Sequence, residues 1–240
     1  MIACDCAVCR SADPRDNRLR PSIYVEGDEG TRILVDTTPD LRQQALRHDI
    51  RRVDAVLYTH AHADHVLGLD ELRRFNHLTR QPVPLYGDRG TLDQIRKTFA
   101  YAFDKDAPAG GGVPDLAMHT IDARPFRIGG QEIIPVPVRH GQWSILGFRF
   151  GRFAYLTDCN AVPDASMALL HDLDVLVLDA LRHRPHPTHF TVAQAVEVAK
   201  VIGARQTLFT HICHDLGHAE TSAKLPPGIG LAYDGQRLTL

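Results

Sequence analysis

The chain has 240 residues, of which 44% are hydrophobic and 23% charged. This composition excludes an intrinsically disordered protein. The net charge of −2, from 27 basic and 29 acidic side chains, argues against a strongly basic protein that coats nucleic acid. No apolar run approaches the roughly 20 residues of a membrane-spanning helix, and the first residues carry no secretory signal. At about 150 residues per domain, the length fits one large domain or two small ones.

The hydrophobic pattern predicts mostly β-structure in the first part of the chain, followed by strands that alternate with helices. Strands are expected at 22–26, 31–36, 53–58, 133–138, 146–150, 153–156, 174–178 and 206–210, with a short hairpin in 230–240. Helices are expected at 40–48, 67–75, 92–102 and 191–202. Residues 104–115 (DKDAPAGGGVPD) have the glycines and prolines of a surface loop. The continuous apolar strands predict sheets covered by helices, hence an α/β fold.

Four potential metal ligands lie within six positions directly after the apolar stretch 53–58: His60, His62, Asp64 and His65. Residues two apart on an extended chain face the same way, so the first two histidines can hold one ion. Where the chain turns into a helix, Asp64 and His65 project elsewhere and can hold a second ion. Imidazole and carboxylate ligands suit zinc, manganese or iron equally, so the pattern predicts two metal ions without identifying the element.

Three further candidate ligands each stand just past the last apolar residue of a predicted strand: His140, Asp158 and His211. Taken singly, the histidines read as ordinary core or surface residues and the aspartate as a helix cap. Loops at strand ends carry the functional site in α/β scaffolds, and this shared position favours metal binding. Each ion would then have three protein ligands and keep a position open for water, as catalytic sites require.

The order of these motifs, from THAHADH at 59–65 to TH at 210–211, resembles the metallo-β-lactamase superfamily. The resemblance implies a single domain over residues 1–240, folded as a four-layer αββα sandwich with a dinuclear metal site at one edge. It also implies that Asp36 supports the site from below, although the residue alone reads as part of a turn at the end of a strand. The ligand set it implies is His60, His62 and His140 on one ion, Asp64, His65 and His211 on the other, and Asp158 bridging both.

The five cysteines are an odd number, and without a signal sequence they indicate reduced thiols and a cytoplasmic protein. Cys4, Cys6 and Cys9 form a CxCxxC motif that can share one structural zinc with a single further ligand. His214 is the favoured fourth ligand, and Cys213 is the alternative. The alternative interpretation is a frayed N-terminus whose three thiols bind no metal. Three thiols within six residues argue against this alternative.

The CxCxxC motif, the following DPRDNRLRPS and the later THICH make the chain similar to the PhnP group, the phosphoribosyl 1,2-cyclic phosphate phosphodiesterases. The resemblance implies a structural zinc on three cysteines and one histidine within residues 1–20 and His214, beside a dinuclear site often occupied by manganese. It implies that His189, within RHRPHPTH at 182–189, protonates the leaving oxygen. The group usually has a strand and a glycine-rich turn before the first cysteine, so we expect that first strand to be missing here.

The function that follows is a metal-dependent phosphodiesterase. Two ions would supply a hydroxide from a shared water, as in the opening of 5-phosphoribosyl 1,2-cyclic phosphate to ribose 1,5-bisphosphate during phosphonate breakdown. His189 and Asp64 are the catalytic candidates, and Arg182, Arg184 and His189 are the substrate-binding ones. The expected partner is a small phosphorylated sugar or nucleotide-like substrate, with no membrane and no nucleic acid, and a homodimer is left open. The alternatives are a tRNA 3′-processing nuclease, a thioester or lactone hydrolase, and a non-enzymatic zinc protein.

Overall fold

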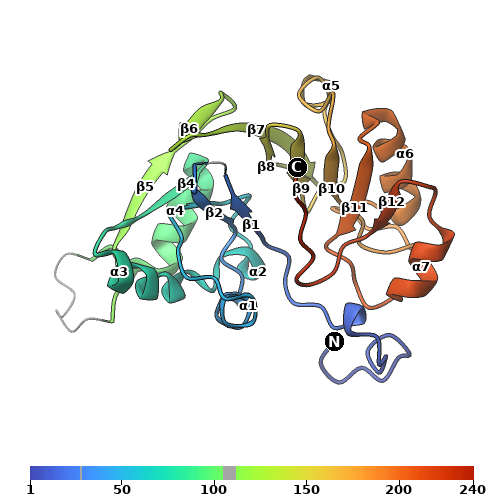
Figure 1. Cartoon of the computed structure of the whole chain (residues 1–240), viewed down its shortest axis with the longest axis horizontal. Coiled ribbons are helices and arrows are strands. Elements are labelled where there is room, and N and C mark those ends of the chain that lie inside the picture. The colour runs from blue at the N-terminus through green and yellow to red at the C-terminus, as the bar shows by residue number, and fades with distance from the viewer. Residues whose placement is uncertain (28, 105–111) are drawn as a thin grey trace. The chain divides into compact units, whose positions relative to one another are not determined.

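The computed structural model describes residues 1–27, 29–104 and 112–240, and the chain divides into two compact units. The smaller unit comprises Arg20–Glu132, and the larger unit combines Met1–Leu19 with Ile133–Leu240. Each unit is built on its own sheet, as Figure 1 shows. The mixed α/β class with two sheets, predicted from the sequence, is therefore confirmed.

The smaller unit holds a five-stranded sheet in which the strands follow one another in sequence order. The first pair is antiparallel and the rest are parallel. Its strands are β1 (Ile23–Glu26), β2 (Arg32–Val35), β3 (Ala55–Leu57), β4 (Val83–Gly87) and β5 (Leu116–Thr120). Its helices are α1 (Leu41–His48), α2 (Ala63–Val66), α3 (Arg73–Thr79) and α4 (Arg89–Thr98).

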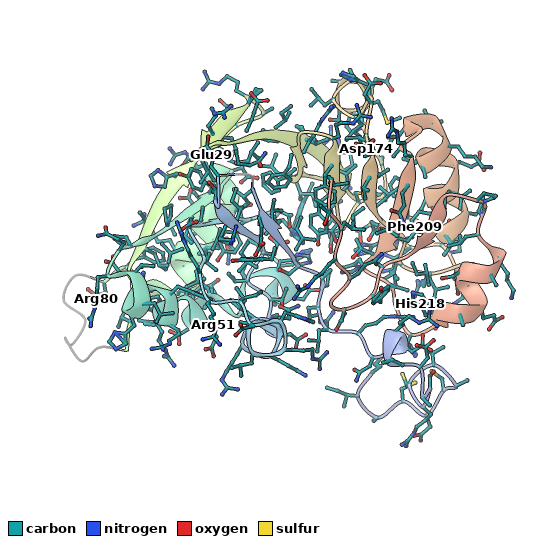
Figure 2. The ribbon with its side chains drawn as sticks, in the orientation of Figure 1. Glu29, Arg51, Arg80, Asp174, Phe209 and His218 are labelled. Atoms are coloured by element: carbon teal, nitrogen blue, oxygen red, sulfur yellow. The ribbon has the colours of Figure 1, made fainter. Side chains whose placement is uncertain are left out.

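The core of the smaller unit forms where the apolar strand residues meet the helices. Leu34, Val56 and Leu85 from three adjacent strands pack with Ile95 of α4, and all four are almost completely buried. Charged side chains such as Arg51 stay on the outside of this unit (Figure 2). The parallel strands are thus covered, as their continuous apolar sequence predicts.

The larger unit contains most of a seven-stranded sheet with the order β12-β11-β10-β9-β8-β7-β6. The strands of this sheet are β6 (Phe126–Ile128), β7 (Gln131–His140), β8 (Trp143–Phe150), β9 (Phe153–Leu156), β10 (Val175–Asp179), β11 (Gln206–Thr210) and β12 (Ile229–Leu231). β6 and the first two residues of β7 belong to the smaller unit, and the rest of the sheet belongs to the larger unit. Its helices are α5 (Asp164–Met167), α6 (Val192–Ile202) and α7 (His218–Lys224). Single turns of 3-10 helix lie at Pro14–Asp16, Leu69–Leu72 and Ala100–Ala102.

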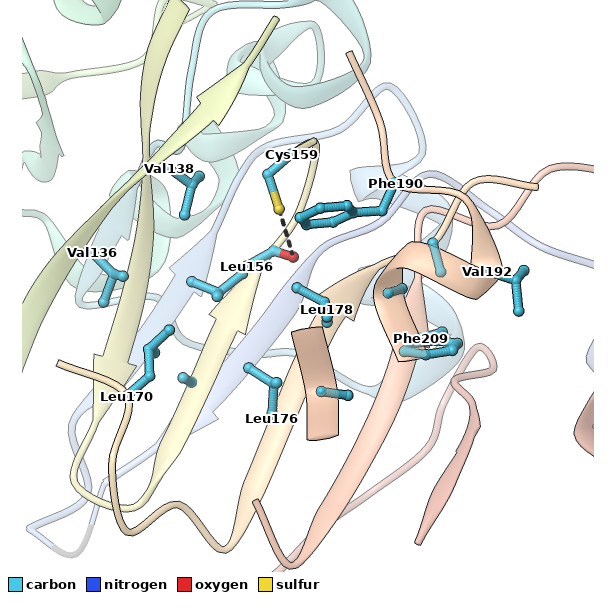
Figure 3. Packing of buried hydrophobic residues seen from close by; sticks show 14 of the residues in the cluster. Val136, Val138, Leu156, Cys159, Leu170, Leu176, Leu178, Phe190, Val192 and Phe209 are labelled. Carbon is cyan, nitrogen blue, oxygen red and sulfur yellow. Dashed lines mark hydrogen bonds between the residues drawn. The ribbon is translucent and has the colours of Figure 1, made fainter. Parts of the chain in front are cut away.

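The core of the larger unit lies between its sheet and the helix α6. Leu156, Leu178 and Phe209 come from three adjacent strands and are fully buried, and Ala195 of α6 packs into the same cluster (Figure 3). Figure 2 places Phe209 within this layer. Every residue of β10 is buried, which explains why all of them except the terminal Asp179 are apolar.

Strand direction decides where the ends of the larger sheet collect. The strands β9, β10 and β11 are mutually parallel, while β7 and β9 both pair antiparallel with β8. The strands β7, β9, β10 and β11 therefore all run in one direction, and their carboxyl ends meet at the same edge of the sheet. The residues at or just beyond those ends are His140, Asp158, Asp179 and His211.

Two sequence expectations need correction. The expected hairpin in 230–240 is wrong: β12 pairs in parallel with β11, and the described residues after Leu231 form no strand. The Asp234 carboxylate instead accepts the backbone N–H of Leu19, so a side chain holds this segment in place of strand pairing. The expected helix at 67–75 is not continuous: α2 already ends at Val66, a 3-10 turn covers Leu69–Leu72, and α3 begins at Arg73. Gly68 lies just before this turn and packs so closely that a Cβ there would lie 2.0 Å from the carbonyl oxygen of Thr38.

Other expectations concern the predicted loop 104–115 and the N-terminal segment. Residues 105–111 of the predicted loop 104–115 lie outside the described residues. Among the described residues, no strand precedes β1. None of the helices in the described part of the chain combines the length and the apolar character that crossing a membrane demands.

The cap of α6 provides a direct test of this architecture. Thr191 and Gln194 form a reciprocal capping box: the Thr191 side chain accepts the Gln194 N–H, and the Gln194 side chain accepts the Thr191 N–H. Thr191→Ala should lower the free energy of unfolding by about 1 kcal/mol, measured by urea titration with an unchanged slope. Thr191→Ser keeps the hydroxyl and is the control. Equal stability of the alanine variant and the wild type would contradict the assigned cap.

Candidate metal centre

The loop after β3 gathers four metal-binding side chains within the smaller unit. The Nε2 atom of His60 lies 3.0 Å from Nδ1 of His62, close to the separation of about 3.3 Å for two nitrogens on one tetrahedral zinc. His65 packs its ring 4.3 Å from that of His60, and its Nε2 lies 3.9 Å from a carboxylate oxygen of Asp64. Asp64 also pairs with the guanidinium of Arg20 at 3.3 Å. Arg20 was not among the site residues predicted from the sequence.

Asp36 lies completely buried beneath this loop and orients two of the histidines. Its carboxylate accepts the backbone N–H and the hydroxyl of Thr59, and it lies 2.7 Å from Nδ1 of His65. Because the Thr59 hydroxyl donates to Asp36, its lone pair is free to accept Nδ1–H of His60 at 2.9 Å. Both histidines then present a deprotonated Nε2 for an ion, as a buried carboxylate behind a ligand histidine usually ensures.

Burial governs the electrostatics of Asp36. It raises the pKa of the carboxyl group, and His65 and Thr59 oppose this shift as partners of the charged form. A buried carboxylate is costly unless hydrogen bonds satisfy its oxygens, and those bonds are present here. Asp36 therefore has the supporting position that the family resemblance implied, although its own role remains a prediction.

The edge of the larger sheet gathers a second set of side chains. One oxygen of Asp158 lies 3.3 Å from Nε2 of His211, and donor atoms of Asp158, His189 and His211 lie within 4.8 Å of one another. The His189 ring stacks on that of His211 at 4.6 Å and meets the ring of His140 edge-on at 5.0 Å. The donors are all imidazole or carboxylate groups, which fit a divalent ion of the zinc or manganese type.

Asp179 is a site residue that the sequence analysis missed. It ends β10 and is fully buried, and its two oxygens accept Nδ1–H of His189 at 3.1 Å and the backbone N–H of Phe190 at 2.9 Å. His211 Nδ1 lies 3.7 Å from the same carboxylate. Burial raises the pKa of Asp179, while the nearby imidazole of His211 opposes that rise. The signal was available, because Asp179 follows an apolar strand in the same way as Asp158 and His211 follow theirs.

Three residues of these two clusters have left-handed backbone conformations. The φ angles are +64° at Asp36, +54° at Asp158 and +56° at His211. Side chains other than glycine seldom adopt this region, and the cost is of order 1 kcal/mol or more for each residue. All three stand just after a strand, so the sharp turn brings the side chain back to the strand end.

The three thiols of CxCxxC meet His214 within the larger unit. Donor atoms of Cys4, Cys6, Cys9 and His214 lie within 4.8 Å of one another, and Nδ1 of His214 is 3.4 Å from the sulfurs of both Cys4 and Cys6. The backbone N–H of Cys9 and then the His214 side chain lower the pKa of the Cys6 thiol to about 6, so it is a thiolate at neutral pH. Three sulfurs and one nitrogen at these separations suit a closed tetrahedral zinc site. Cys213 is not a member of this cluster.

Further bonds tie the N-terminal segment to the loop that carries His214. Arg18 donates to the carbonyl oxygens of Cys213 and Leu216, and Asp16 accepts the backbone N–H of His218. These contacts hold the sulfur-bearing segment against the part of the chain that begins at His211 (Figure 1).

The two predicted substrate-binding arginines stand on the loop between β10 and α6, and both have partners within the larger unit. Arg184 pairs with Asp215 at 2.8 Å, and Arg182 donates to the carbonyl oxygens of Arg184 and Pro185. Their guanidinium groups therefore shape the loop before His189. Their role toward a substrate stays a prediction.

Residues 31–212 match the model of the beta-lactamase superfamily domain. The crystal structure of a new diphosphatase from the PhnP family is 49% identical, with a TM-score of 0.92, over 99% of this chain and 90% of that one. The chain belongs to the metallo-β-lactamase superfamily and, within it, to the PhnP family. The membership that the motifs predicted is thereby confirmed.

Two curated relatives widen the comparison. An octanoyltransferase from Porphyromonas gingivalis is 37% identical over 98% of this chain and 47% of its own length. A ribonuclease Z from Bradyrhizobium diazoefficiens is 33% identical over 57% of this chain and 46% of its own length. The chain thus spans about half the length of these two relatives. The fold of the family implies divalent metal ions, and each unit carries histidine and aspartate side chains of the kind that bind them.

The sulfur cluster can be tested by metal analysis. Cys6→Ser removes one thiolate, so the protein should bind about one zinc ion fewer per chain and should unfold at lower urea concentration. Elemental analysis and urea titration measure the two effects. Cys213→Ser is the matched control and should retain both the zinc and the stability. Unchanged zinc content in the Cys6 variant would contradict the assignment, and loss of zinc in the control would make Cys213 a ligand.

Proposed function

We propose that this metallo-hydrolase is a phosphodiesterase that holds two divalent ions, manganese or zinc, at its catalytic site and one structural zinc at the sulfur cluster. The observation that carries the proposal is the convergence of imidazole and carboxylate donors at the ends of strands in both units. The catalytic ligands are His60, His62 and His140 for one ion, Asp64, His65 and His211 for the other, and Asp158 for both.

The proposed substrate is a phosphodiester, with the 1,2-cyclic phosphate of 5-phosphoribose as the leading compound. When bound, a pair of divalent ions activates a water molecule and neutralises the charge that develops on the phosphoryl oxygens. The residues of the chain then have to hold the ions, orient the ester and deliver a proton to the departing sugar oxygen.

His189 is the proposed source of that proton. Its Nδ1–H is committed to the Asp179 carboxylate, so Nε2 is the atom that carries and releases the proton. The buried carboxylate favours the protonated imidazole and keeps the ring in one orientation, which is how a positioned aspartate supports a catalytic histidine. Asp179 is therefore proposed as a positioning residue for His189. The stacking of His189 on His211 leaves a competing role, because its Nε2 could instead bind a metal ion.

A second candidate substrate class is a diphosphate. It is favoured by the likeness to a diphosphatase of the PhnP family over 99% of the chain. A cyclic phosphodiester and a diphosphate ester have a common feature, since the phosphorus of the first and the ester-bearing phosphorus of the second each carry two bridging oxygens. The same ligands and the same proton donor would serve either bond, so substrate shape outside the reacting phosphorus decides between them.

A substrate panel tests the class of reaction. The manganese-loaded protein should hydrolyse 5-phosphoribosyl 1,2-cyclic phosphate or a diphosphate ester. It should show little activity on a thioester, a lactone or precursor tRNA. Removal of the ions with a chelator should abolish turnover, and added manganese should restore it. The proposal fails if the acyl compounds or tRNA are turned over faster than every phosphoryl compound.

Variants of His189 and Asp179 separate proton donation from metal binding. His189→Gln should lower kcat about 100-fold or more for an alkyl leaving group, and much less for 4-nitrophenolate, which leaves without a proton. Asp179→Asn should show the same dependence on the leaving group in weaker form. Elemental analysis of both variants is the control. A loss of catalytic metal in the His189 variant, with equal effects on both leaving groups, would make His189 a ligand.

A further inference from the structure

Trp143 is the single tryptophan of the chain, and it stands directly opposite a predicted metal ligand. The register of β7 and β8 pairs His140 with Trp143 across the hairpin. Side chains of such a cross-strand pair project from the same face of the sheet. The two rings have centroids 6.4 Å apart and are tilted by 53°. Trp143 therefore lies on the sheet face that presents His140.

The burial of Trp143 differs from that of the other large aromatic residues on these strands. Its surface is 59% exposed, whereas Phe148, Phe150 and Tyr155 are at most 6% exposed. An isolated exposed aromatic residue is ordinary by itself. The position of this one beside His140, whose ring in turn contacts His189, connects it to the strand-end cluster.

The turn that carries Trp143 is fixed by several contacts within the larger unit. Gly141 has a φ of +61°, and a Cβ there would lie 2.9 Å from the Thr188 methyl group, so the turn fits closely against the loop before His189. The Gly141 N–H donates to Asn160, whose amide donates to the carbonyl oxygen of Pro187. These contacts fix the backbone of the turn next to Trp143, which lowers the entropic cost of binding a ligand there.

A flat, exposed aromatic face beside a phosphate-hydrolysing centre suits one kind of chemistry. Nucleobases stack on tryptophan, and such contacts contribute substantially to the affinity of nucleotide-binding proteins. In a nucleotide the base lies one sugar ring away from the phosphate. Trp143 stands one side chain away from a predicted metal ligand, which is a comparable arrangement.

We propose that Trp143 is a specificity-determining residue of this site, whose indole stacks on the planar base of a phosphoryl substrate that carries a purine or pyrimidine. This inference rests on the proposed function, because it assumes that the phosphoryl group reacts at the strand-end cluster. It adds base-bearing substrates to the leading compound above, the base-free cyclic phosphate of 5-phosphoribose, which has no base to contact Trp143.

Fluorescence tests binding independently of turnover. Because Trp143 is the sole tryptophan, selective excitation reports on this side chain alone. In the metal-loaded protein, adenosine 5′-monophosphate should quench or shift the emission in a saturable way, while ribose 5-phosphate, which lacks only the base, should not. If the metal-loaded protein hydrolyses no phosphoryl compound but still shows the fluorescence response, the proposed function is refuted and the base-binding site is retained.

Kinetics supply the second arm. Trp143→Ala should raise KM about tenfold or more for 2′,3′-cyclic AMP and leave KM for 5-phosphoribosyl 1,2-cyclic phosphate unchanged. Trp143→Phe keeps a stacking face and should recover most of the affinity. Val201→Ala, on the exposed side of α6, is the control for removal of an exposed apolar side chain and should change neither value.

The outcomes are decisive in both arms. Absence of any fluorescence response to adenosine 5′-monophosphate overturns the proposal, whether or not that compound inhibits hydrolysis. An equal rise in KM for the base-bearing and base-free substrates also overturns it. If the alanine variant does not fold, the fluorescence titration of the wild type and the phenylalanine variant still decide the question.

Discussion

Hydrogen bonds from imidazoles to fully buried carboxylates are the interaction on which the candidate site depends. Asp36 in the smaller unit and Asp179 in the larger unit each lie beneath a histidine, at 2.7 Å from His65 and 3.1 Å from His189. Removing a carboxylate from water is expensive, and only a full set of donors makes it tolerable. Each aspartate therefore has backbone or hydroxyl donors in addition to its histidine. These donors fix the ring and leave the outward nitrogen available for chemistry.

The parallel direction of neighbouring strands brings the histidines and aspartates together without long loops. Parallel strands end at one edge, so a residue placed just after each strand contributes to a shared cluster without long loops. The left-handed conformations at Asp36, Asp158 and His211 turn the chain sharply at those ends. Such strain persists where the surrounding structure determines it, and the buried sheets beneath provide that support. The scaffold thus bears a local cost at the positions where side chains must converge.

The sulfur cluster adds a second constraint to the loop that follows β11. His214 lies three residues after His211, and Arg18 bonds the carbonyl groups on either side of it to the N-terminal segment. A zinc ion on the three thiols and His214 would therefore stabilise the loop in which His211 stands. The proposed structural site and the proposed catalytic ligand share one short stretch of chain, so zinc binding at the first would support the geometry of the second.

The sequence by itself determined the family, the mixed α/β class, most strands and the candidate ligands, because these depend on local patterns. An apolar run followed by a histidine or aspartate can be recognised without knowing its neighbours, as at His60 and His211. Only the tertiary structure revealed Asp179 as the partner of His189 and Trp143 as the partner of His140. The terminal strand β12 also depended on tertiary contacts, because it pairs in parallel with β11 although the local sequence predicted a hairpin in 230–240. These features depend on strand register and direction, which join residues far apart in the chain, and no local pattern encodes such contacts.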